Sequence, residues 1–263
     1  MKETQRCSII GFGRFGQLLA SILRQEFSVM VHDVREDRRV AQEIGVDFVS
    51  FERACQAPTI FLCVPISALE PVLQRAKLHL RPGSLVMDTC SVKVYPAQVM
   101  QCQLPETVEA LATHPLFGPD SAKHGLHGLR IVFCPLRVSD ERLEFWRAFW
   151  QRHGLIIIEK TPDEHDRLAA YSQGITHLVG RVLGELDLHL GEISTRGFED
   201  ILGVIEQTNH DTWELFHDLQ HYNPYTRQMR DELVRAFNTI MANLDPEENP
   251  EENEENNEGK RQK

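Results

Sequence analysis

His114 lies in the segment Thr113-His-Pro-Leu-Phe-Gly-Pro119. Its imidazole can take up a proton near neutral pH, which makes this residue a candidate general base. A residue before proline is kept out of helical conformation, and the prolines and Gly118 predict a stiff loop just beyond a strand. Such a loop suits a catalytic base; the alternative is an ordinary loop histidine.

Hydroxyl groups follow another predicted strand, in Asp88-Thr-Cys-Ser-Val-Lys93. Ser91 and Thr89 are placed where a sheet exposes loops that face a ligand, beyond the carboxyl end of a strand. They belong either to a site at that edge or to the N-cap of the next helix.

A polar row interrupts an otherwise apolar helix in the segment Tyr171-Ser-Gln-Gly-Ile-Thr-His177. Its members are Ser172, Gln173, Thr176 and His177. The row predicts a substrate-binding wall that faces a cofactor, or else a satisfied network between helices.

A dinucleotide site is predicted by a strand, the glycine turn Gly11-Phe-Gly-Arg-Phe-Gly16 and a helix over residues 15–26. The first glycine permits a tight turn, Gly13 lets the backbone approach a pyrophosphate, and the last lets the helix pack close to its strand. Asp33 follows the next apolar run, as the fingerprint requires. The predicted cofactor-binding residues are Gly11, Gly13, Arg14, Phe15, Gly16, Asp33, Val64 and Pro65, the last ending a strand near the nicotinamide ribose.

The acidic Asp33 favours the ribose hydroxyls of NAD and repels the extra phosphate of NADP. Arg35, Arg38 and Arg39 are close enough in sequence to rescue NADP. We therefore expect NAD, with NADP as the alternative.

These segments need a sheet to position them. Short apolar runs alternate with amphipathic stretches up to Lys160, which predicts an α/β fold with a doubly wound, mainly parallel sheet, a Rossmann domain over residues 1–160. The expected strands are 7–10, 28–32, 59–64, 84–88, 129–134 and 155–159. Residues 161–244 show apolar positions at helical spacing and predict an all-helical domain that is too small to form a sufficient core, so we expect it to form a homodimer.

Composition narrows the function classes. The chain has 263 residues, a formal net charge of −11 and 41% apolar residues, which argues against a nucleic-acid partner. Apolar runs are of strand length and the start resembles no signal peptide, so we expect a cytoplasmic protein with no membrane association. Residues 245–263 are mostly acidic and predict a disordered tail. The six cysteines form no C-x-x-C pair and predict reduced, buried side chains with no metal.

In their order and spacing, these motifs resemble the prephenate and arogenate dehydrogenases of tyrosine biosynthesis. The resemblance covers roughly residues 6–240 and includes Cys-Val-Pro65, Glu164-His-Asp-Arg167 and Ser172-Gln-x-x-Thr-His177. It is greatest to the plant-type arogenate enzymes, which share a segment like Glu206-x-Thr-x-x-Asp211.

The resemblance implies an oxidoreductase that oxidatively decarboxylates a cyclohexadienol, with a Rossmann domain and a helical dimerisation domain. His114 matches the catalytic histidine, and Ser91 matches a serine that orients it. His177 matches a substrate-binding histidine, with Gln173 beside it. Asp211 matches an acidic residue suited to the ammonium group of arogenate; the alternative is that it caps the helix that starts near Trp213.

One position departs from the family pattern. Many prephenate-using members carry an arginine where this chain has Gly203, so the usual carboxylate clamp is absent. Arg181, Arg227 or Arg230 could replace it. Two rivals remain: a dehydrogenase of the β-hydroxyacid type, which should carry a helical lysine that residues 161–259 lack, and a non-catalytic NAD(P)-sensing protein.

Overall fold

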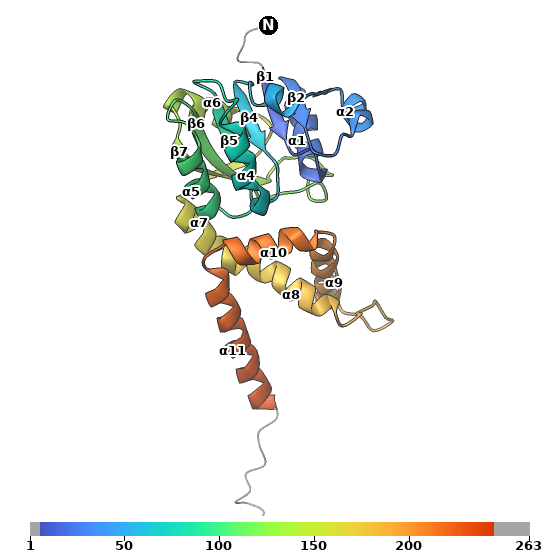
Figure 1. The fold of residues 1–263 in the computed structure, drawn as a ribbon. Helices are drawn as coiled ribbons and strands as arrows, with labels where there is room; N and C mark the ends of the chain where they lie inside the picture. Colours follow the sequence, from blue (N-terminus) through green and yellow to red (C-terminus); the bar gives the residue numbers. More distant parts are fainter. Residues whose placement is uncertain (1–5, 245–263) are drawn as a thin grey trace, which may run out of the picture. The chain divides into compact units, whose positions relative to one another are not determined.

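The computed structural model describes residues 6–244. An eight-stranded sheet has the order β3-β2-β1-β4-β5-β6-β7-β8 (Figure 1). The strands are β1 (Arg6–Ile10), β2 (Ser28–His32), β3 (Asp47–Phe48), β4 (Thr59–Leu62), β5 (Leu85–Asp88), β6 (Glu109–Pro115), β7 (Arg130–Arg137) and β8 (Ile156–Glu159). All pairs are parallel except β6 with β7, which confirms the predicted α/β class.

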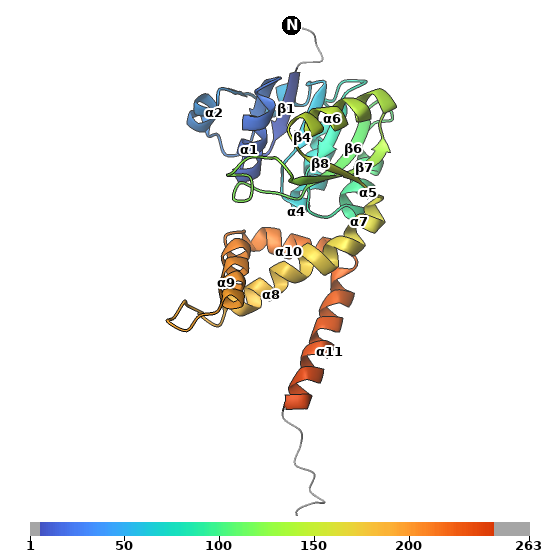
Figure 2. The same ribbon diagram turned by 180° about the vertical axis from the view of Figure 1, so that it is seen from behind.

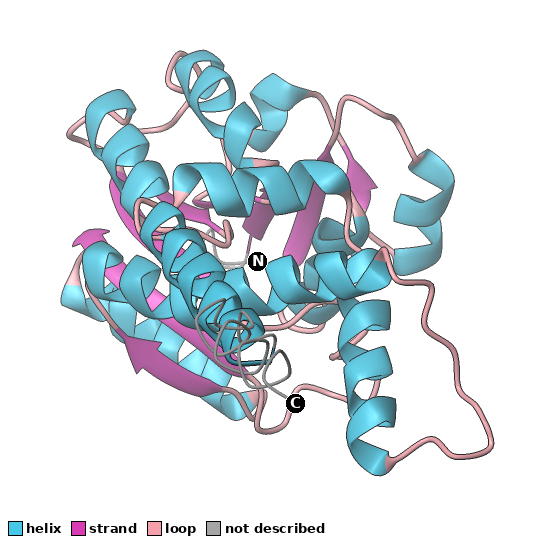
Figure 3. Cartoon of the chain, turned by 90° about the horizontal axis from the view of Figure 1, so that it is seen from below, coloured by secondary structure: helices cyan, strands magenta, loops and turns pink. Residues whose placement is uncertain are grey.

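Helices lie on both faces of this sheet, and Figure 3 shows the strands between them. The helices up to β8 are α1 (Arg14–Leu23), α2 (Arg38–Ile44), α3 (Phe51–Ala54), α4 (Ile66–Ala76), α5 (Val94–Gln103) and α6 (Asp140–Arg152). The first of them ends three residues before the predicted Glu26.

Two apolar clusters form the core because successive strand residues point to opposite faces. Phe61 joins the cluster of α1 and α6, whereas its neighbours Ile60 and Leu62 join the cluster of α4 and α5. These helices can be followed in Figures 1 and 2. Both faces are therefore covered, and the carboxyl ends of the parallel strands are left to carry the loops.

β6 corrects the prediction for His114. No strand is predicted over residues 109–115 and the histidine is expected in a loop, but His114 lies inside a buried strand that pairs with β5 and β7. His114 is outside any helix, as expected for the residue before a proline, because a strand has an extended backbone just as the expected loop would. The proline is the last residue of the strand, where a missing N–H group is tolerated.

The segment after β8 is helical in the described residues, as predicted. It contains α7 (Pro162–Ala169), the π-helical turn η2 (Ala170–Gly174), α8 (Ile175–Gly184), α9 (Arg196–Asn209), α10 (Trp213–Tyr222) and α11 (Thr226–Leu244). α8 and α9 pack closely at Gly180. A Cβ atom there would lie 2.3 Å from Thr208 Oγ1, so the contact requires glycine.

The described residues divide into two compact units, one up to Thr226 and one from Arg227 onward. The first holds the sheet together with α7 to α10, and the second contains nearly all of α11. None of the described helices has the length and apolar character of a membrane-spanning segment. The predicted acidic tail over residues 245–263 lies outside the described residues.

The cysteine prediction needs one correction. All six cysteines are free, and four are buried, but Cys102 is exposed and Cys63 is half-buried. Burial raises the pKa of Cys63 to about 12, so its thiol stays protonated at neutral pH.

Candidate active site

The glycine turn after β1 has the backbone geometry that a dinucleotide site needs. Gly11 has φ +100°, and a Cβ atom there would lie 2.3 Å from the carbonyl oxygen of Cys63. A Cβ atom at Gly16 would lie 2.1 Å from Gly11 O, so both positions require glycine. Gly13 faces open space and is the N-cap of α1, with no side chain to accept the first helical N–H groups. These groups can therefore receive an anionic phosphate.

Asp33 follows β2 and braces the same turn. Its Oδ2 atom accepts a hydrogen bond from the N–H of Phe12 at 2.6 Å, and its Oδ1 atom accepts one from the N–H of Arg35 at 2.9 Å. A carboxylate has about four acceptor positions, so it can still accept from a ribose hydroxyl.

The arginines that could rescue NADP are partly engaged elsewhere. Arg38 pairs with Glu36 at 2.8 Å, and Arg39 lies 3.6 Å from Glu43. All four side chains are largely exposed, so these pairs are weak, but the acids oppose a phosphate dianion near Asp33.

Of the remaining predicted cofactor residues, Arg14 and Phe15 begin α1, and Val64 and Pro65 lie in the loop between β4 and α4. Arg14 forms an ion pair of 2.7 Å with Asp120, which lies in the loop after β6. The Phe15 ring lies 6.2 Å from that of Phe117 in the same loop. Pro65 is the N-cap of α4, so the loop after β4 turns directly into this helix beside Gly11. The residues present fit a dinucleotide.

His114 is 3% exposed and lies one residue before the end of β6. Its Nδ1 atom lies 2.8 Å from Nε2 of His165, and the two rings pack edge to face. Burial holds the pKa of His114 well below its ordinary value, and the positive charge of the nearby Lys93 lowers it further. The imidazole is therefore neutral at pH 7, as a general base must be.

A buried ion pair fixes the backbone next to His114. Lys93 and Asp88 are both fully buried, and the lysine Nζ atom donates to the carboxylate and, at 2.6 Å, to the carbonyl oxygen of Thr113. The N–H of Thr113 also donates to Asp88 Oδ1 at 3.1 Å. This pair ties β6 to the end of β5 directly before the histidine.

Ser91 makes no hydrogen bond to His114 in this structure, and the Nδ1 atom of His114 meets His165 instead. The Oγ atom of Ser91 is buried and has no hydrogen-bond partner within residues 6–244. The alternative, a helix cap, is not seen either: the N-cap of α5 is Lys93, and Thr89 Oγ1 donates to the carbonyl of Leu62. A substrate or cofactor role for Ser91 stays a prediction.

The predicted polar row lies across a π-helical turn. Ser172 and Gln173 belong to η2, and His177 follows on α8. Such turns shift the register of a helix and are frequent at functional sites. The satisfied network proposed as the alternative is incomplete among the described residues, since Gln173 Oε1 and His177 Nδ1 are buried without a partner. Burial also lowers the pKa of His177, despite the opposing charge of Asp211.

Asp211 lies beside this row. Its Oδ2 atom is 3.8 Å from His177 Nε2, and its side chain is 30% exposed. The cap of α10 is Thr212, whose hydroxyl accepts from the N–H of Leu215 at 3.1 Å, so the alternative of a capping role for Asp211 is wrong. The carboxylate of Asp211 therefore has no capping role and lies beside His177.

Arg181 is one turn beyond His177 on α8. It donates to the backbone carbonyl of Asp211, and its guanidinium lies 4.5 Å from the centre of the Trp213 ring. Its Nε atom is buried and has no partner among the described residues. Arg227 and Arg230 lie instead on α11.

The helical segment is anchored to the N-terminal ends of α4 and α5, which begin at the carboxyl edge of the sheet. Asp218 on α10 accepts from both the N–H and the hydroxyl of Ser67 at 3.0 Å. Asp166 on α7 accepts from the N–H groups of Lys93 and Val94 at 2.6 and 2.8 Å. The first compact unit therefore carries both the predicted cofactor residues and the polar row.

Sequence reasoning gave no role to His165, Asp166 and Lys93. The available signal was that all three lie in quoted motifs, Glu164-His-Asp-Arg167 and Asp88-Thr-Cys-Ser-Val-Lys93. Their contacts join positions up to 73 residues apart, which no local pattern shows.

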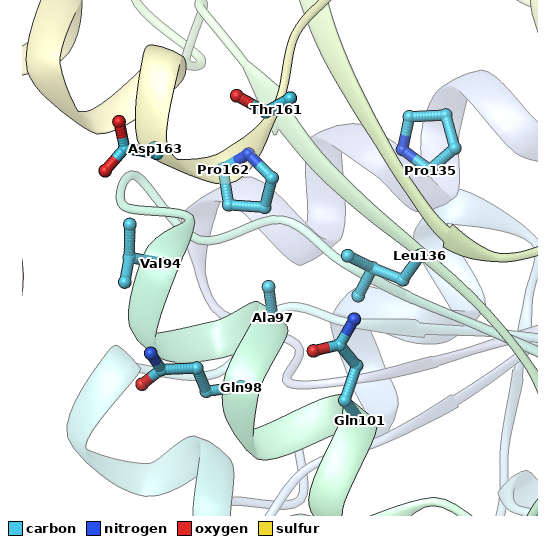
Figure 4. Close-up of a pocket in the computed structure, with 9 residues that line it drawn as sticks. All are labelled: Val94, Ala97, Gln98, Gln101, Pro135, Leu136, Thr161, Pro162 and Asp163. Atoms are coloured by element: carbon cyan, nitrogen blue, oxygen red, sulfur yellow. The ribbon is translucent and has the colours of Figure 1, made fainter.

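A surface pocket of about 400 Å³ lies between α5, β7 and the start of α7 (Figure 4). It contains none of the predicted site residues. Its one charged residue, Asp163, is engaged by Arg167 at 3.0 Å and by the hydroxyl of Tyr225. We assign it no role in catalysis.

The glycine turn, the braced aspartate and the buried histidine define a Rossmann-fold protein with the parts of a dehydrogenase. Residues 19–159 match the family described as "Prephenate dehydrogenase, nucleotide-binding domain", and residues 182–257 match "TYRAAT1-like, C-terminal domain". The chain belongs to the prephenate and arogenate dehydrogenase family of oxidoreductases.

Two relatives illustrate the similarity. "Arogenate dehydrogenase 2, chloroplastic" of Arabidopsis thaliana is 33% identical over 249 residues, covering 91% of this chain and 70% of the relative. "Probable arogenate/prephenate dehydrogenase" of Methanocaldococcus jannaschii is 28% identical over 266 residues, covering 94% and 59%. The chain spans only part of the length of each of these relatives.

Solved structures share the fold. The prephenate dehydrogenase of A. aeolicus in complex with hydroxyphenyl propionate and NAD+ superposes with a TM-score of 0.71 at 17% identity, over 97% of each chain. The Synechocystis arogenate dehydrogenase gives a TM-score of 0.64 at 20% identity, over 97% of this chain and 98% of that one. The predicted Rossmann domain followed by a helical segment is confirmed.

Proposed function

We propose that this protein is an NAD-dependent dehydrogenase that oxidatively decarboxylates arogenate, prephenate or both, in tyrosine biosynthesis. The observation that carries the proposal is the buried, neutral His114 near the end of β6, at the sheet edge that also carries the glycine turn. The family membership and the NAD+ in the A. aeolicus structure support it.

The reaction removes a hydride and a proton from one alcohol. Bound NAD supplies the hydride acceptor. Nε2 of His114 takes the hydroxyl proton as the hydride leaves the carbinol carbon. The ring carboxylate then departs as carbon dioxide, its bonding electrons complete an aromatic ring, and the ring oxygen takes the proton back from His114 to form the phenol. A well-placed base contributes a factor on the order of 10² to 10⁴ to such a step.

Polar groups of η2 and α8 are proposed to bind the substrate. His177 Nδ1 and Gln173 Oε1 are buried hydrogen-bonding atoms without a partner in the described part of the chain, so a polar ligand would satisfy both. Ser91 Oγ, which is also buried without a partner in the described residues, is proposed as a further contact of the substrate or cofactor. Arg181 is our candidate for a substrate carboxylate, because the family's usual arginine is replaced by Gly203.

Steady-state kinetics with arogenate and prephenate, each crossed with NAD and NADP, tests the proposed function. We expect turnover with at least one substrate and a higher kcat/KM with NAD, because Asp33 opposes a phosphate. Absence of turnover in all four combinations would favour a non-catalytic NAD(P)-binding protein. A tenfold preference for NADP would show that Arg35, Arg38 and Arg39 outweigh Asp33.

Asp211 is expected to set the choice between the substrates. Arogenate carries an ammonium group where prephenate has a keto group, and a carboxylate favours the ammonium. We expect arogenate to be used at least as efficiently as prephenate, and Asp211→Asn to shift the ratio of kcat/KM values toward prephenate by about tenfold, the effect of 1.4 kcal/mol.

Glu214→Gln is the matched control, since it removes an exposed carboxylate from the first turn of α10 and should leave that ratio unchanged. If Asp211→Asn also leaves the ratio unchanged, the carboxylate does not contact the substrate.

We also propose that the chain forms a homodimer through its helical segments. Val182 on α8 and Leu186, two residues after the end of that helix, are 58% and 61% exposed, and α11 carries an exposed apolar stripe at helical spacing. The stripe consists of Val234, Phe237, Ile240, Met241 and Leu244. Exposed apolar surface of this kind marks an interface, and multi-angle light scattering measures the mass of the protein in solution, which should be that of a dimer.

A cytoplasmic location stays a prediction, because the Arabidopsis thaliana relatives are named as chloroplastic.

A further inference from the structure

Three buried side chains form a line behind the proposed base. His114 Nδ1 lies 2.8 Å from Nε2 of His165, and His165 Nδ1 lies 2.8 Å from Oδ1 of Asp166. All three are at most 4% exposed. Neither His165 nor Asp166 has a place in the mechanism given above.

Asp166, at the end of this line away from His114, determines which ring nitrogens of the two histidines carry protons. Asp166 accepts hydrogen bonds from the backbone N–H groups of Lys93 and Val94, so its carboxylate meets donors on both oxygens. An ionised carboxylate only accepts, and therefore Nδ1 of His165 must carry the proton that points at it. In the neutral ring the other nitrogen, Nε2, is then an acceptor.

The protonation of His165 determines that of His114. Because His165 Nε2 accepts, His114 Nδ1 must donate, and the lone pair of His114 lies on Nε2. The opposite arrangement would require a cationic His165 and would put the His114 proton on Nε2. In that arrangement Nε2 could not take a proton from an alcohol.

We propose that His165 and Asp166 are positioning residues that hold His114 in the one neutral tautomer in which Nε2 is the base. This inference rests on the proposed function, since it assigns how the base of that reaction is prepared. When Nε2 gains the hydroxyl proton, both ring nitrogens of His114 carry protons, and the bond from Nδ1 to His165 stabilises the resulting cation.

The low pKa of His114 agrees with this arrangement. The buried ring is neutral before reaction, so its tautomer decides whether it works as a base. An unconstrained imidazole would distribute its proton between both nitrogens. Only the Nδ1–H form is productive here, provided that Nε2 faces the substrate.

Two variants of His165 separate positioning from packing. His165→Gln keeps a donor for Asp166 and an acceptor for His114, whereas His165→Leu keeps only bulk. We expect His165→Leu to lower kcat on the order of a hundredfold with little change in the substrate KM. His165→Gln should recover kcat to within about tenfold of wild type, because its amide oxygen can accept from His114 Nδ1–H.

Unfolding midpoints of both variants are measured first, so that kcat values are compared between folded proteins. Wild-type kcat in His165→Leu, or equal losses of kcat in two folded variants, would overturn the proposal. A rise in KM at unchanged kcat would overturn it as well, because it would indicate a binding role.

Nitrogen-15 NMR of the histidine rings in the wild-type protein tests the tautomer directly and needs no activity. We expect His114 to show a protonated Nδ1 and an unprotonated Nε2 at pH 7, assigned by the loss of its signals in His114→Asn. A protonated Nε2 would overturn the inference even if the enzyme turns over arogenate. Failure of the kinetic assay with the expected tautomer would instead refute the proposed function. The spectrum decides the tautomer even if His165→Leu does not fold.

Discussion

His114→Asn is expected to lower kcat by at least about a hundredfold while leaving the affinity for NAD unchanged. The buried ring is neutral because burial holds its pKa low, and asparagine cannot take a proton from the substrate hydroxyl. The glycine turn and Asp33 do not contact His114 through any described hydrogen bond, so cofactor binding should survive. Stopped-flow turnover and a fluorescence titration with NAD measure the two quantities.

His189→Asn is the matched control, because His189 is largely exposed in the loop between α8 and α9. Its kcat should equal that of the wild type. Turnover of His114→Asn within a few fold of the control would remove His114 from the mechanism and would make the buried imidazole a structural feature of β6.

Lys93→Met is expected to lower the free energy of unfolding by roughly 3 to 5 kcal/mol, because it strands the buried charge of Asp88. Lys93 and Asp88 are both fully buried, and the lysine also bonds the carbonyl of Thr113. The methionine has a similar volume but offers no donor. We expect the loss of kcat to accompany the loss of stability, since Thr113 precedes the proposed base.

Urea denaturation followed by tryptophan fluorescence measures this change. Lys77→Met is the matched control: its ammonium contacts Gln103 at the exposed surface at 3.2 Å, and its effect should stay within about 0.5 kcal/mol. If Lys93→Met were as stable as this control, the ion pair would be replaceable by apolar packing, and Asp88 would have to be neutral in the variant.

The dinucleotide turn was predictable because its geometry is local. Gly11 and Gly16 lie within six residues of each other, and the close backbone contacts that they permit recur wherever a strand turns into a helix over a phosphate. Asp33 follows from the same pattern at a fixed distance along the chain. The α/β class was predictable for a similar reason, since buried parallel strands read as short apolar runs between helices.

The strand that carries His114 was missed. Residues 109–115 contain alanines, a histidine and a proline, which have little preference for strands, and the strand forms because β5 and β7 lie on either side of it. The role of Asp211 was left open by the sequence, because an aspartate before a helix is a plausible cap. The structure excluded the cap by placing the hydroxyl of Thr212 on the N–H of Leu215, and the substrate role of Asp211 stays a prediction.

By itself the sequence determined the Rossmann turn, the helical second half and the types of residue that carry chemistry. Only the tertiary structure decided which of them meet: His165 reaches His114 across 51 positions, and Asp166 reaches Lys93 across 73. Glycine turns and periodic apolar residues act through neighbouring backbone atoms and therefore leave a local pattern. Hydrogen bonds between buried side chains depend on the packing of β6 against α7 and α5, which is set by the burial of the whole core.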